Sequence, residues 1–325
     1  MTRRKLLVGA TVLTLFGLGQ GPARAAPGCF VGIAMYTLSA PYFAAQQKSA
    51  VAQAKSLGCQ VTTTDGQDDM QKEISDVQDM VAKGINILIL NPRDPKGLIP
   101  AANAATAAGV KVVAMDNSID PAAKIVTLVQ SSNQKNGELV GAWLAHQMAG
   151  KKMKIALISG QQGSGAGLER REGVLRGLNE AQLAQHARVD WEIVGQGWGG
   201  WVQEGGLNAM EDLLTAHPDI NVVLGENDSM VLGARNALKA ANRLDGVLLL
   251  AAADGQKEAL KLIQDGQYGA TGLNDPALVA TTAVNFGYKA WKGELPAGFP
   301  TVYYTTPVVI TKANVSQYYK ADAVF

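Results

Sequence analysis

Ile85-Asn86-Ile87-Leu88-Ile89-Leu90, followed at once by Asn91-Pro92, is the stretch that decides the fold. The run is almost wholly apolar, which is typical of a strand buried on both faces of a parallel sheet. The segment before it carries apolar residues at helical spacing from Ile74 to Val81. The second half of the chain repeats this pair, with a helical stripe from Leu207 to Leu214 and a strand at 220–225. The pattern indicates two related α/β units in one chain.

Short apolar runs alternate with longer helical patterns along the chain, which favours repeated β-α-β units around parallel sheets. We expect strands at 30–36, 59–64, 85–90, 110–115, 124–129, 153–158, 188–194, 220–225, 246–251 and 268–272. We expect helices at 41–57, 68–83, 94–108, 134–149, 167–184, 201–216, 227–241, 255–265 and 276–292. The two sets of five strands predict an α/β fold with two similar lobes, and 325 residues suffice for two separate cores.

Residues 1–25 have the features of an export signal peptide. A basic start at Arg3-Arg4-Lys5 precedes an apolar run over residues 6–18 and a small-x-small cleavage site at Ala23-Arg24-Ala25. The apolar run is too short for a membrane-spanning helix. We therefore expect cleavage near Ala25 and an exported mature protein. The export route stays open, because the adjacent arginines also resemble a twin-arginine signal, which would mean export after folding.

Charge and motif content exclude several function classes. Lys and Arg total 29 against 28 for Asp and Glu, so binding to nucleic acid has no electrostatic support. The histidines, His146, His186 and His217, lie far apart without the spacing of metal ligands. The sequence contains no Gly-x-Ser-x-Gly motif of hydrolases, no His-Glu-x-x-His motif of zinc proteases, no Walker loop and no EF-hand loop. We expect no metal or other cofactor, and a small neutral partner.

Polar and aromatic side chains gather just past the carboxyl ends of the predicted strands, where open α/β sheets bind ligands. These residues include Tyr36, Tyr42, Phe43, Asn91, Asp116, Asn117, Gln161, Gln162, Trp198, Trp201, Asn227, Asp228, Asp254 and Asn274. Amides and carboxylates bind hydroxyls and aromatic rings cover the C–H faces of a sugar, so the set predicts a polyhydroxylated neutral ligand. The alternative for each Asn or Asp is a local role, because these residues often cap the next helix or hold a turn.

A competing motif lies at Gly195-Gln196-Gly197-Trp198-Gly199-Gly200, which satisfies G-x-G-x-x-G between a predicted strand and a predicted helix. Glu226 ends the next strand, as a dinucleotide-binding unit would require. This motif leaves an exported NAD(P)-dependent oxidoreductase as the alternative function. Against it, the unit starts at the seventh strand rather than the first, and Trp198 and Trp201 flank the glycines where a pyrophosphate needs close backbone approach.

Nearly the whole mature chain resembles the periplasmic solute-binding proteins of carbohydrate ABC transporters, in the ribose-binding-like group. The matching stretches are Pro41-Tyr42-Phe43, Asp79 to Pro92, Asp116, Leu168 to Gly173, Gly206 to Asp219, Glu226-Asn227-Asp228 and Asp254-Gly255. The resemblance implies two Rossmann-like lobes with parallel sheets, joined by a three-strand hinge, with a ligand cleft between the lobes. It implies an N-terminal lobe of residues 26–131 plus 275–305 and a C-terminal lobe of residues 132–274 plus 306–325, with crossings near Ser131, Asn274 and Thr305.

The resemblance also implies which residues contact the ligand. The stacking residues are Tyr42, Phe43 and Trp201, the polar contacts are Asn91, Asp116, Arg170, Asn227, Asp254 and Asn274, and the strand-end argument adds Tyr36 and Asn117. Two positions depart from the ribose-binding pattern, because Ala40 stands where an asparagine is expected and Asn117 where an arginine is usual. The loss of two strong donors puts ribose in doubt and leaves another pentose or hexose, a furanose or a linear polyol.

Further expectations follow from the same resemblance. The protein is expected to be a periplasmic monomer that binds a sugar or polyol without converting it and delivers it to a membrane permease; presentation to a chemoreceptor is a second role that the sequence cannot separate. Cys29 and Cys59 lie at the amino ends of the first two predicted strands, which are parallel neighbours in this kind of sheet. We therefore expect them to form a disulfide, the alternative being two separate buried thiols.

Overall fold

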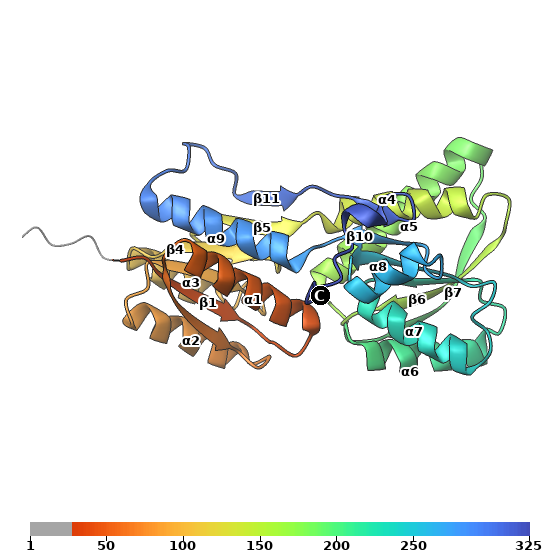
Figure 1. The fold of residues 1–325 in the computed structure, drawn as a ribbon, viewed down its shortest axis with the longest axis horizontal. Helices are drawn as coiled ribbons and strands as arrows, with labels where there is room; N and C mark the ends of the chain where they lie inside the picture. Colours follow the sequence, from red (N-terminus) through yellow and green to blue (C-terminus); the bar gives the residue numbers. More distant parts are fainter. Residues whose placement is uncertain (1–27) are drawn as a thin grey trace, which may run out of the picture.

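The computed structural model describes residues 28–325, so the predicted export signal lies outside the described residues. Two α/β lobes lie side by side along the longest axis of the molecule (Figure 1). Within the described part of the chain, no helix is both long and apolar enough to cross a membrane.

The first lobe is built on a six-stranded parallel sheet with the order β11-β5-β4-β3-β1-β2. Its strands are β1 (Phe30–Met35), β2 (Gln60–Asp65), β3 (Ile87–Asn91), β4 (Lys111–Met115), β5 (Thr127–Ser131) and β11 (Val302–Thr305), and its helices are α1 (Pro41–Ser56), α2 (Met70–Ala82), α3 (Ile99–Ala107) and α9 (Pro276–Lys292). The strand β3 fills both faces of the core, because Leu88 and Leu90 pack with α2 and α3 while Ile87 and Ile89 pack with α1 and α9. Burial of each such side chain stabilises the fold by about 1.5–3 kcal/mol.

The second lobe repeats this plan with the strand order β12-β10-β9-β8-β6-β7. Its strands are β6 (Met153–Ser159), β7 (Trp191–Trp198), β8 (Val222–Gly225), β9 (Leu248–Asp254), β10 (Ala270–Leu273) and β12 (Val309–Thr311). Its helices are α4 (Asn133–Gln147), α5 (Gly165–His186), α6 (Gln203–Ala216), α7 (Asp228–Ala240), α8 (Lys257–Gln264) and the short 3₁₀ helix η1 (Val315–Gln317). Of these strands only β12 runs antiparallel to its neighbour.

Every predicted strand and helix is present in the structure, with ends that differ by up to five residues, the largest difference being the start of α3 at Ile99 instead of residue 94. The strands β11 and β12 were not predicted. Both are short edge strands, and β11 reads Val302-Tyr303-Tyr304-Thr305 with its two central residues exposed, so it lacks the apolar run that indicates the inner strands. Each sheet therefore has six strands where the sequence predicts five.

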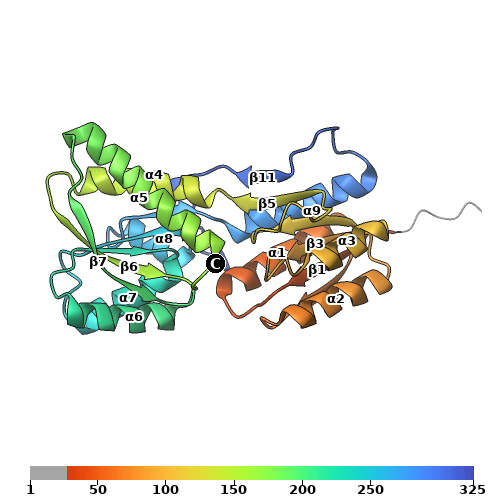
Figure 2. The ribbon, with the colours of Figure 1, turned by 180° about the vertical axis from the view of Figure 1, so that it is seen from behind.

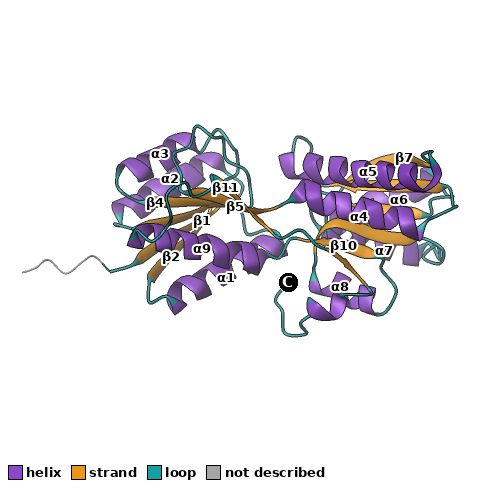
Figure 3. Cartoon of the chain, turned by 90° about the horizontal axis from the view of Figure 1, so that it is seen from above, coloured by secondary structure: helices purple, strands orange, loops and turns teal. Residues whose placement is uncertain are grey.

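The chain crosses between the two sheets three times, after β5, after β10 and between β11 and β12. These crossings lie side by side in the view from above (Figure 3). Asn136 of α4 links them: its Nδ2 donates to the Leu273 carbonyl at 2.7 Å and to Ser131 Oγ at 2.7 Å, and its Oδ1 accepts from the Val308 amide at 3.0 Å. One side chain thus contacts all three crossings.

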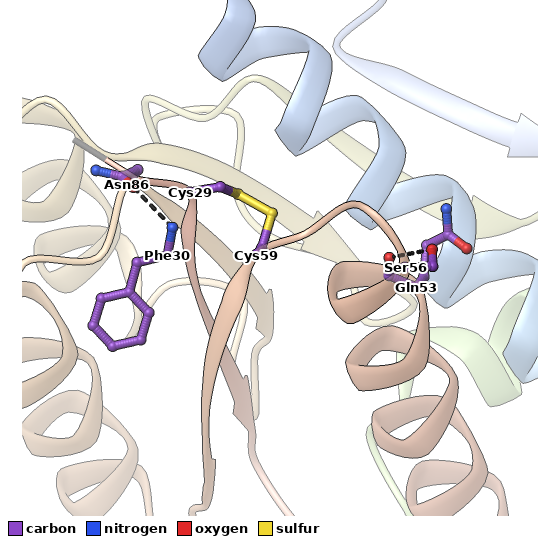
Figure 4. The surroundings of a disulfide bond; sticks show 6 residues. All are labelled: Cys29, Phe30, Gln53, Ser56, Cys59 and Asn86. Atoms are coloured by element: carbon purple, nitrogen blue, oxygen red, sulfur yellow. Dashed lines mark hydrogen bonds between the residues drawn. A yellow bond between two sulfur atoms is a disulfide. The ribbon is translucent and has the colours of Figure 1, made fainter. Parts of the chain in front are cut away.

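Cys29 and Cys59 are bonded as a disulfide in the structure (Figure 4). The parallel register pairs Phe30 with Gln60, which brings the preceding residues together with a Cα–Cα distance of 4.6 Å. This distance lies within the range that a disulfide requires. The bond closes a loop that contains α1 and links the residue before β1 to the residue before β2.

The glycine-rich motif does not form a dinucleotide-binding turn, because β7 continues to Trp198 and so contains Gly195 and Gly197. The two glycines instead allow α6 to pack closely on this strand. A Cβ atom at Gly195 would lie 2.5 Å from Leu213 Cδ2, and one at Gly197 would lie 2.6 Å from Ala209 Cβ. The prediction that the motif follows a strand is therefore wrong, and the oxidoreductase reading loses its structural basis.

Candidate ligand site between the lobes

A cleft of about 520 Å³ lies between the lobes at the carboxyl ends of their strands, a volume suited to a small molecule. Its lining contains every residue expected to contact the ligand except Asn91, namely Tyr36, Tyr42, Phe43, Asp116, Asn117, Arg170, Trp201, Asn227, Asp254 and Asn274. The strand-end residues Trp198 and Asp228 do not line the cleft. A larger cavity of about 780 Å³ lies in the second lobe beside Trp143, Arg235 and Tyr268 and contains none of them. The interlobe cleft is therefore the candidate site, on its chemistry rather than its size.

Aromatic side chains form the first-lobe wall of the cleft. Pro41 starts α1, since proline is well suited to the first turn of a helix, and this start places Tyr42 and Phe43 in the wall of the cleft. The Phe43 ring meets Tyr36 and Tyr42 edge to face, with centroid distances of 4.9 and 5.5 Å. Burial raises the pKa of Tyr36 and Tyr42 well above the usual value for tyrosine, so both hydroxyls keep their hydrogen.

The Tyr42 hydroxyl joins the two lobes. It lies 2.8 Å from Asp116 Oδ1 of the first lobe and 2.9 Å from Asn274 Oδ1 at the second crossing. Asp116 adopts a left-handed backbone conformation with φ of 66°, which Asp tolerates better than most residues, and its N–H donates to the Val129 carbonyl at 2.8 Å. Burial raises the pKa of the half-buried Asp116 carboxyl to about 6. The site therefore holds a carboxyl group that titrates near neutral pH.

Asp254 and Arg170 form a buried ion pair in the second lobe. The Arg170 Nη2 lies 3.2 Å from Asp254 Oδ1, and Asn274 Nδ2 donates to the same oxygen at 3.2 Å. The side chains of Arg170 and Asp254 are only 8% and 5% exposed. Burial raises the pKa of Asp254, while the positive charge of Arg170 opposes that rise. A buried cation and a buried amide therefore contact Asp254 within the protein itself.

Close packing of α4 on α5 positions Arg170. The two helices lie against one another along the outer face of the second sheet (Figure 2). This approach requires glycine at position 137, where a Cβ would lie 2.6 Å from the Arg170 carbonyl oxygen. It brings Asn133, at the start of α4, within reach of Arg170, whose Nε donates to Asn133 Oδ1 at 3.0 Å. The Arg170 Nη1 donates to the Glu226 carbonyl at 3.0 Å, so the guanidinium is held on three sides.

Trp201 forms the aromatic wall of the second lobe. The sequence predicts that a helix begins at this residue, but Trp201 lies in the turn before α6 with a left-handed φ of 71°. Its ring lies over Gly160, where a Cβ atom would be 2.2 Å from the indole. The Arg170 guanidinium lies 5.6 Å from the ring centroid, in the range of a cation–π contact. The turn thus presents an indole face beside the Arg170–Asp254 pair.

Two predicted polar contacts are engaged with the protein itself. Asn227 caps α7, since its side chain accepts from the Met230 amide at 3.1 Å, and its Nδ2 donates to the Trp201 carbonyl at 3.1 Å. Asn117 donates to the Pro92 carbonyl at 3.0 Å. Both residues line the cleft, so they carry the local role that the sequence left as an alternative and still present a polar edge to the cavity.

The structure does not place Asn91 on the wall of the cleft. Asn91 is the last residue of β3, is fully buried, and donates from its Nδ2 to Gln46 Oε1 of α1 at 2.8 Å. The sequence correctly gives the strand end, but the direction of this side chain depends on the packing of α1 over the sheet.

Several residues of the cleft were not predicted as ligand contacts. They are Ala40, Pro41, Asp68, Pro92, Arg93, Asp94, Pro95, Ser118, Asn133, Gln161, Gln162, Gly163, Ser164, Gly165, Ala166 and Ser229. Gln161 and Gln162 were visible as strand-end residues, whereas Asn133 lies in a crossing where no sequence signal indicates its partner. At the rim, Arg93 pairs with Asp68 at 2.8 Å, a contact between distant segments. Among the described residues, no group of three His, Cys, Asp or Glu side chains is arranged to hold a metal ion.

The family model of the periplasmic binding protein domain matches residues 31–295, most of the chain. This chain belongs to that family. A ribose import binding protein of Bacillus subtilis is 34% identical over 254 residues, which cover 78% of each chain. The relatives are binding proteins, and the family is one of exported periplasmic proteins, in agreement with the expected export.

Solved structures of other family members have the same two-lobed fold. An ABC transporter solute-binding protein from Mycobacterium smegmatis, solved with bound glycerol, is 33% identical, has a TM-score of 0.79 and covers 91% of this chain and 99% of its own. A periplasmic solute-binding protein from Actinobacillus succinogenes, solved with bound D-allose, is 28% identical, has a TM-score of 0.80 and covers 89% and 100%. The fold and family predicted from the sequence are thus confirmed.

Proposed function

We propose that this periplasmic binding protein binds a neutral monosaccharide or sugar alcohol in the interlobe cleft and delivers it to the membrane permease of an ABC importer. One observation carries the proposal. A continuous set of polar contacts runs from one lobe to the other, between aromatic rings on both walls of the cleft. Its members are Tyr42, Asp116, Asn274, Asp254 and Arg170.

The chemistry of this set suits a polyhydroxylated ligand. The carboxylates of Asp116 and Asp254 accept hydrogen bonds from hydroxyl groups, and Arg170 donates to ring or hydroxyl oxygens. The Tyr42, Phe43 and Trp201 rings supply apolar faces for C–H groups. A ligand that contacts both lobes binds the closed arrangement more tightly than the open one, and so shifts the population toward the form that a permease would recognise.

The ligand class rests on the relatives and on two residues of this chain. The similar proteins are named for ribose or hold glycerol or D-allose, all neutral compounds with several hydroxyls. Ala40 and Asn117 line the cleft where the ribose-binding pattern has stronger donors. We therefore propose a ligand other than ribose, chosen from pentoses, hexoses, furanoses and linear polyols.

The remaining parts of the proposal concern organisation and partners. The lobes comprise residues 26–131 plus 275–305 and residues 132–274 plus 306–325, and the protein acts as a monomer after cleavage near Ala25. It binds its ligand without converting it. Presentation of the closed form to a chemoreceptor would use the same two-lobed surface, and no contact among the described residues favours that role over delivery to a permease.

A thermal-shift screen of the mature protein against pentoses, hexoses and polyols tests the function. At a sugar concentration of ~100 times Kd, linkage adds about 2.7 kcal/mol of stability, which raises Tm by a few degrees in a chain of this size. Calorimetric titration of the best compound should give one site per chain, and the compound should be recovered unchanged after incubation. Conversion of the sugar, or reduction of added NAD or NADP, would contradict binding without turnover.

A further inference from the structure

The segment Lys320–Phe325 leaves the second lobe and reaches the first. The preceding helix η1 is anchored in the second lobe, where Val315 is 2% exposed within the core and Tyr318 and Tyr319 pack against it. The end of the described chain, marked C, lies between the two lobes in the three views of the molecule (Figures 1, 2 and 3). We call Lys320–Phe325 the strap.

The strap is fastened beside the turn that carries Asp254. Lys257, the first residue of α8, follows Asp254 by three positions, and its Nζ donates to the Ala323 carbonyl at 2.7 Å. The Ala323 amide donates to the Lys320 carbonyl at 3.1 Å, which forms a turn within the strap. The middle of the strap is therefore held by the second lobe at the edge of the candidate ligand site.

The far end of the strap covers an aromatic residue of the first lobe. The Phe325 ring meets the Tyr42 ring edge to face, with a centroid distance of 5.5 Å and an interplanar angle of 88°. Phe43 meets Tyr42 in the same geometry at 5.5 Å. Tyr42 is only 7% exposed although it lines the cleft. Two edge-to-face contacts thus restrict the ring whose hydroxyl joins Asp116 to Asn274.

We propose that Phe325 is a positioning residue of the sugar site, which acts through Tyr42, and that the strap makes the site depend on a direct contact between the lobes. This inference rests on the proposed function. Phe325 does not line the cleft, so we expect it to act on the ligand through Tyr42. It holds the Tyr42 ring in the orientation that directs its hydroxyl to both lobes, and it adds apolar contact to the arrangement in which they lie together.

Three variants of the mature protein test the role of Phe325 in binding. Phe325→Ala removes the ring, Phe325→Tyr keeps it, and Val324→Ala changes the neighbouring side chain, which is 61% exposed, as the matched control. An edge-to-face aromatic pair accounts for an affinity change of roughly two- to tenfold. Titration with the best compound of the thermal-shift screen should show this loss for Phe325→Ala, with the parent affinity in Phe325→Tyr and Val324→Ala. Circular dichroism spectra check that all three variants are folded. Equal affinity in Phe325→Ala and Val324→Ala would overturn the proposal.

A second measurement is independent of any sugar. Small-angle X-ray scattering of the free protein should give a larger radius of gyration for Phe325→Ala than for the parent, because the lobes lose a direct contact, while Val324→Ala should match the parent. Lys257→Ala, which releases the middle of the strap, should change the radius in the same direction. An unchanged radius of gyration in both variants would overturn the proposal that the strap holds the lobes together. If no sugar binds the parent protein, the proposed function fails while this scattering result still decides the strap.

Discussion

The carboxylate of Asp228 accepts the backbone N–H of Asp254 at 3.0 Å, and so links the start of α7 to the end of β9. The same oxygen accepts the N–H groups of Gly255 and Gln256 at 2.7 and 2.9 Å, and Tyr268 donates its hydroxyl to the other oxygen at 2.7 Å. Asp228 is fully buried. It therefore holds the turn that places Asp254 against Arg170.

Asp228→Asn should destabilise the protein, because an amide cannot accept all of these hydrogen bonds. Hydrogen bonds to a charged group contribute about 1.5–3 kcal/mol each, so we expect the free energy of unfolding to fall by at least that amount. Urea unfolding monitored by circular dichroism measures the change. Asp79→Asn, at an exposed position on α2, is the matched control and should leave the midpoint unchanged. Equal midpoints for the two variants would show that Asp228 has no such role.

Asp254→Ala should lower both stability and sugar affinity. The substitution leaves the buried Arg170 guanidinium without its carboxylate, and breaking a buried pair by removing one partner costs about 3–5 kcal/mol. Thermal melts of the free protein and calorimetric titration of the folded fraction separate the two effects. Asp254→Asn keeps the shape and one hydrogen-bond acceptor and should lose less. A free protein as stable as the parent would contradict the buried pair.

Sugar affinity should rise between pH 5 and pH 7. Burial raises the pKa of Asp116 to about 6, and ligand hydroxyls that donate to this carboxyl favour its ionised form. The ionised fraction at pH 5 is about one tenth of that at pH 7, so the affinity should increase by up to roughly tenfold. Titration at four pH values gives the profile. In Asp116→Asn the dependence should flatten; a parent protein with constant affinity would exclude ionisation of this group on binding.

The free protein should lose stability as the pH rises from 5 to 8. Burial raises the pKa of Glu73 to about 7 and of Asp228 to about 6, so these groups hold more protons in the folded state than in the unfolded state above pH ~4. The stability that comes from this extra proton binding is complete below the pKa values of the unfolded chain. It is lost as the pH rises through the pKa values of the folded protein. Glu73 accepts the Arg93 amide at 3.1 Å through one oxygen, while its other oxygen is buried without a partner. Melting temperatures at constant ionic strength should fall, and Glu73→Gln should reduce that fall.

Reduction of the Cys29–Cys59 disulfide should destabilise the mature protein. The cysteines are 30 positions apart, and closing a loop of this size contributes about 3–4 kcal/mol on the chain-entropy model. Melts with and without dithiothreitol measure the loss, and the double variant Cys29→Ser with Cys59→Ser should melt with the reduced parent. Identical melts with and without reductant, at confirmed reduction, would mean that the loop is already constrained in the unfolded chain.

Sequence alone predicts the elements of this fold because their apolar residues follow helix or strand periodicity. Stretches such as 85–90 are buried on both faces, so their composition directly reflects their surroundings. The edge strand β11 has exposed residues on a four-residue segment and gives no such signal. Gly195 and Gly197 wrongly suggested a dinucleotide-binding site, since close helix packing and phosphate binding both require glycine.

The sequence predicts which residues line the site better than it predicts the contacts that these residues make. Strand-end position places Asp116 at the edge of the first sheet, and Asp254 and Asn274 at the edge of the second, because parallel strands bring their carboxyl ends to the same edge of a sheet. The cleft lies between these two edges. Whether such a side chain is solvated depends on partners from distant segments. Arg170 reaches Asp254 from another helix, and Gln46 turns Asn91 away under α1. These contacts follow from tertiary packing, which periodicity does not encode.

Asn136 links the three crossings into one hinge between the lobes. Because its amide contacts Ser131, Leu273 and Val308, the three crossings cannot bend independently, and we expect the lobes to swing about a single axis through this residue. Points far from that axis then travel along wide arcs, while Asn274, one residue beyond Leu273, stays almost stationary. Asn274 can thus keep its contacts with Tyr42 and with Asp254 while the two lobes rotate about the axis beside it.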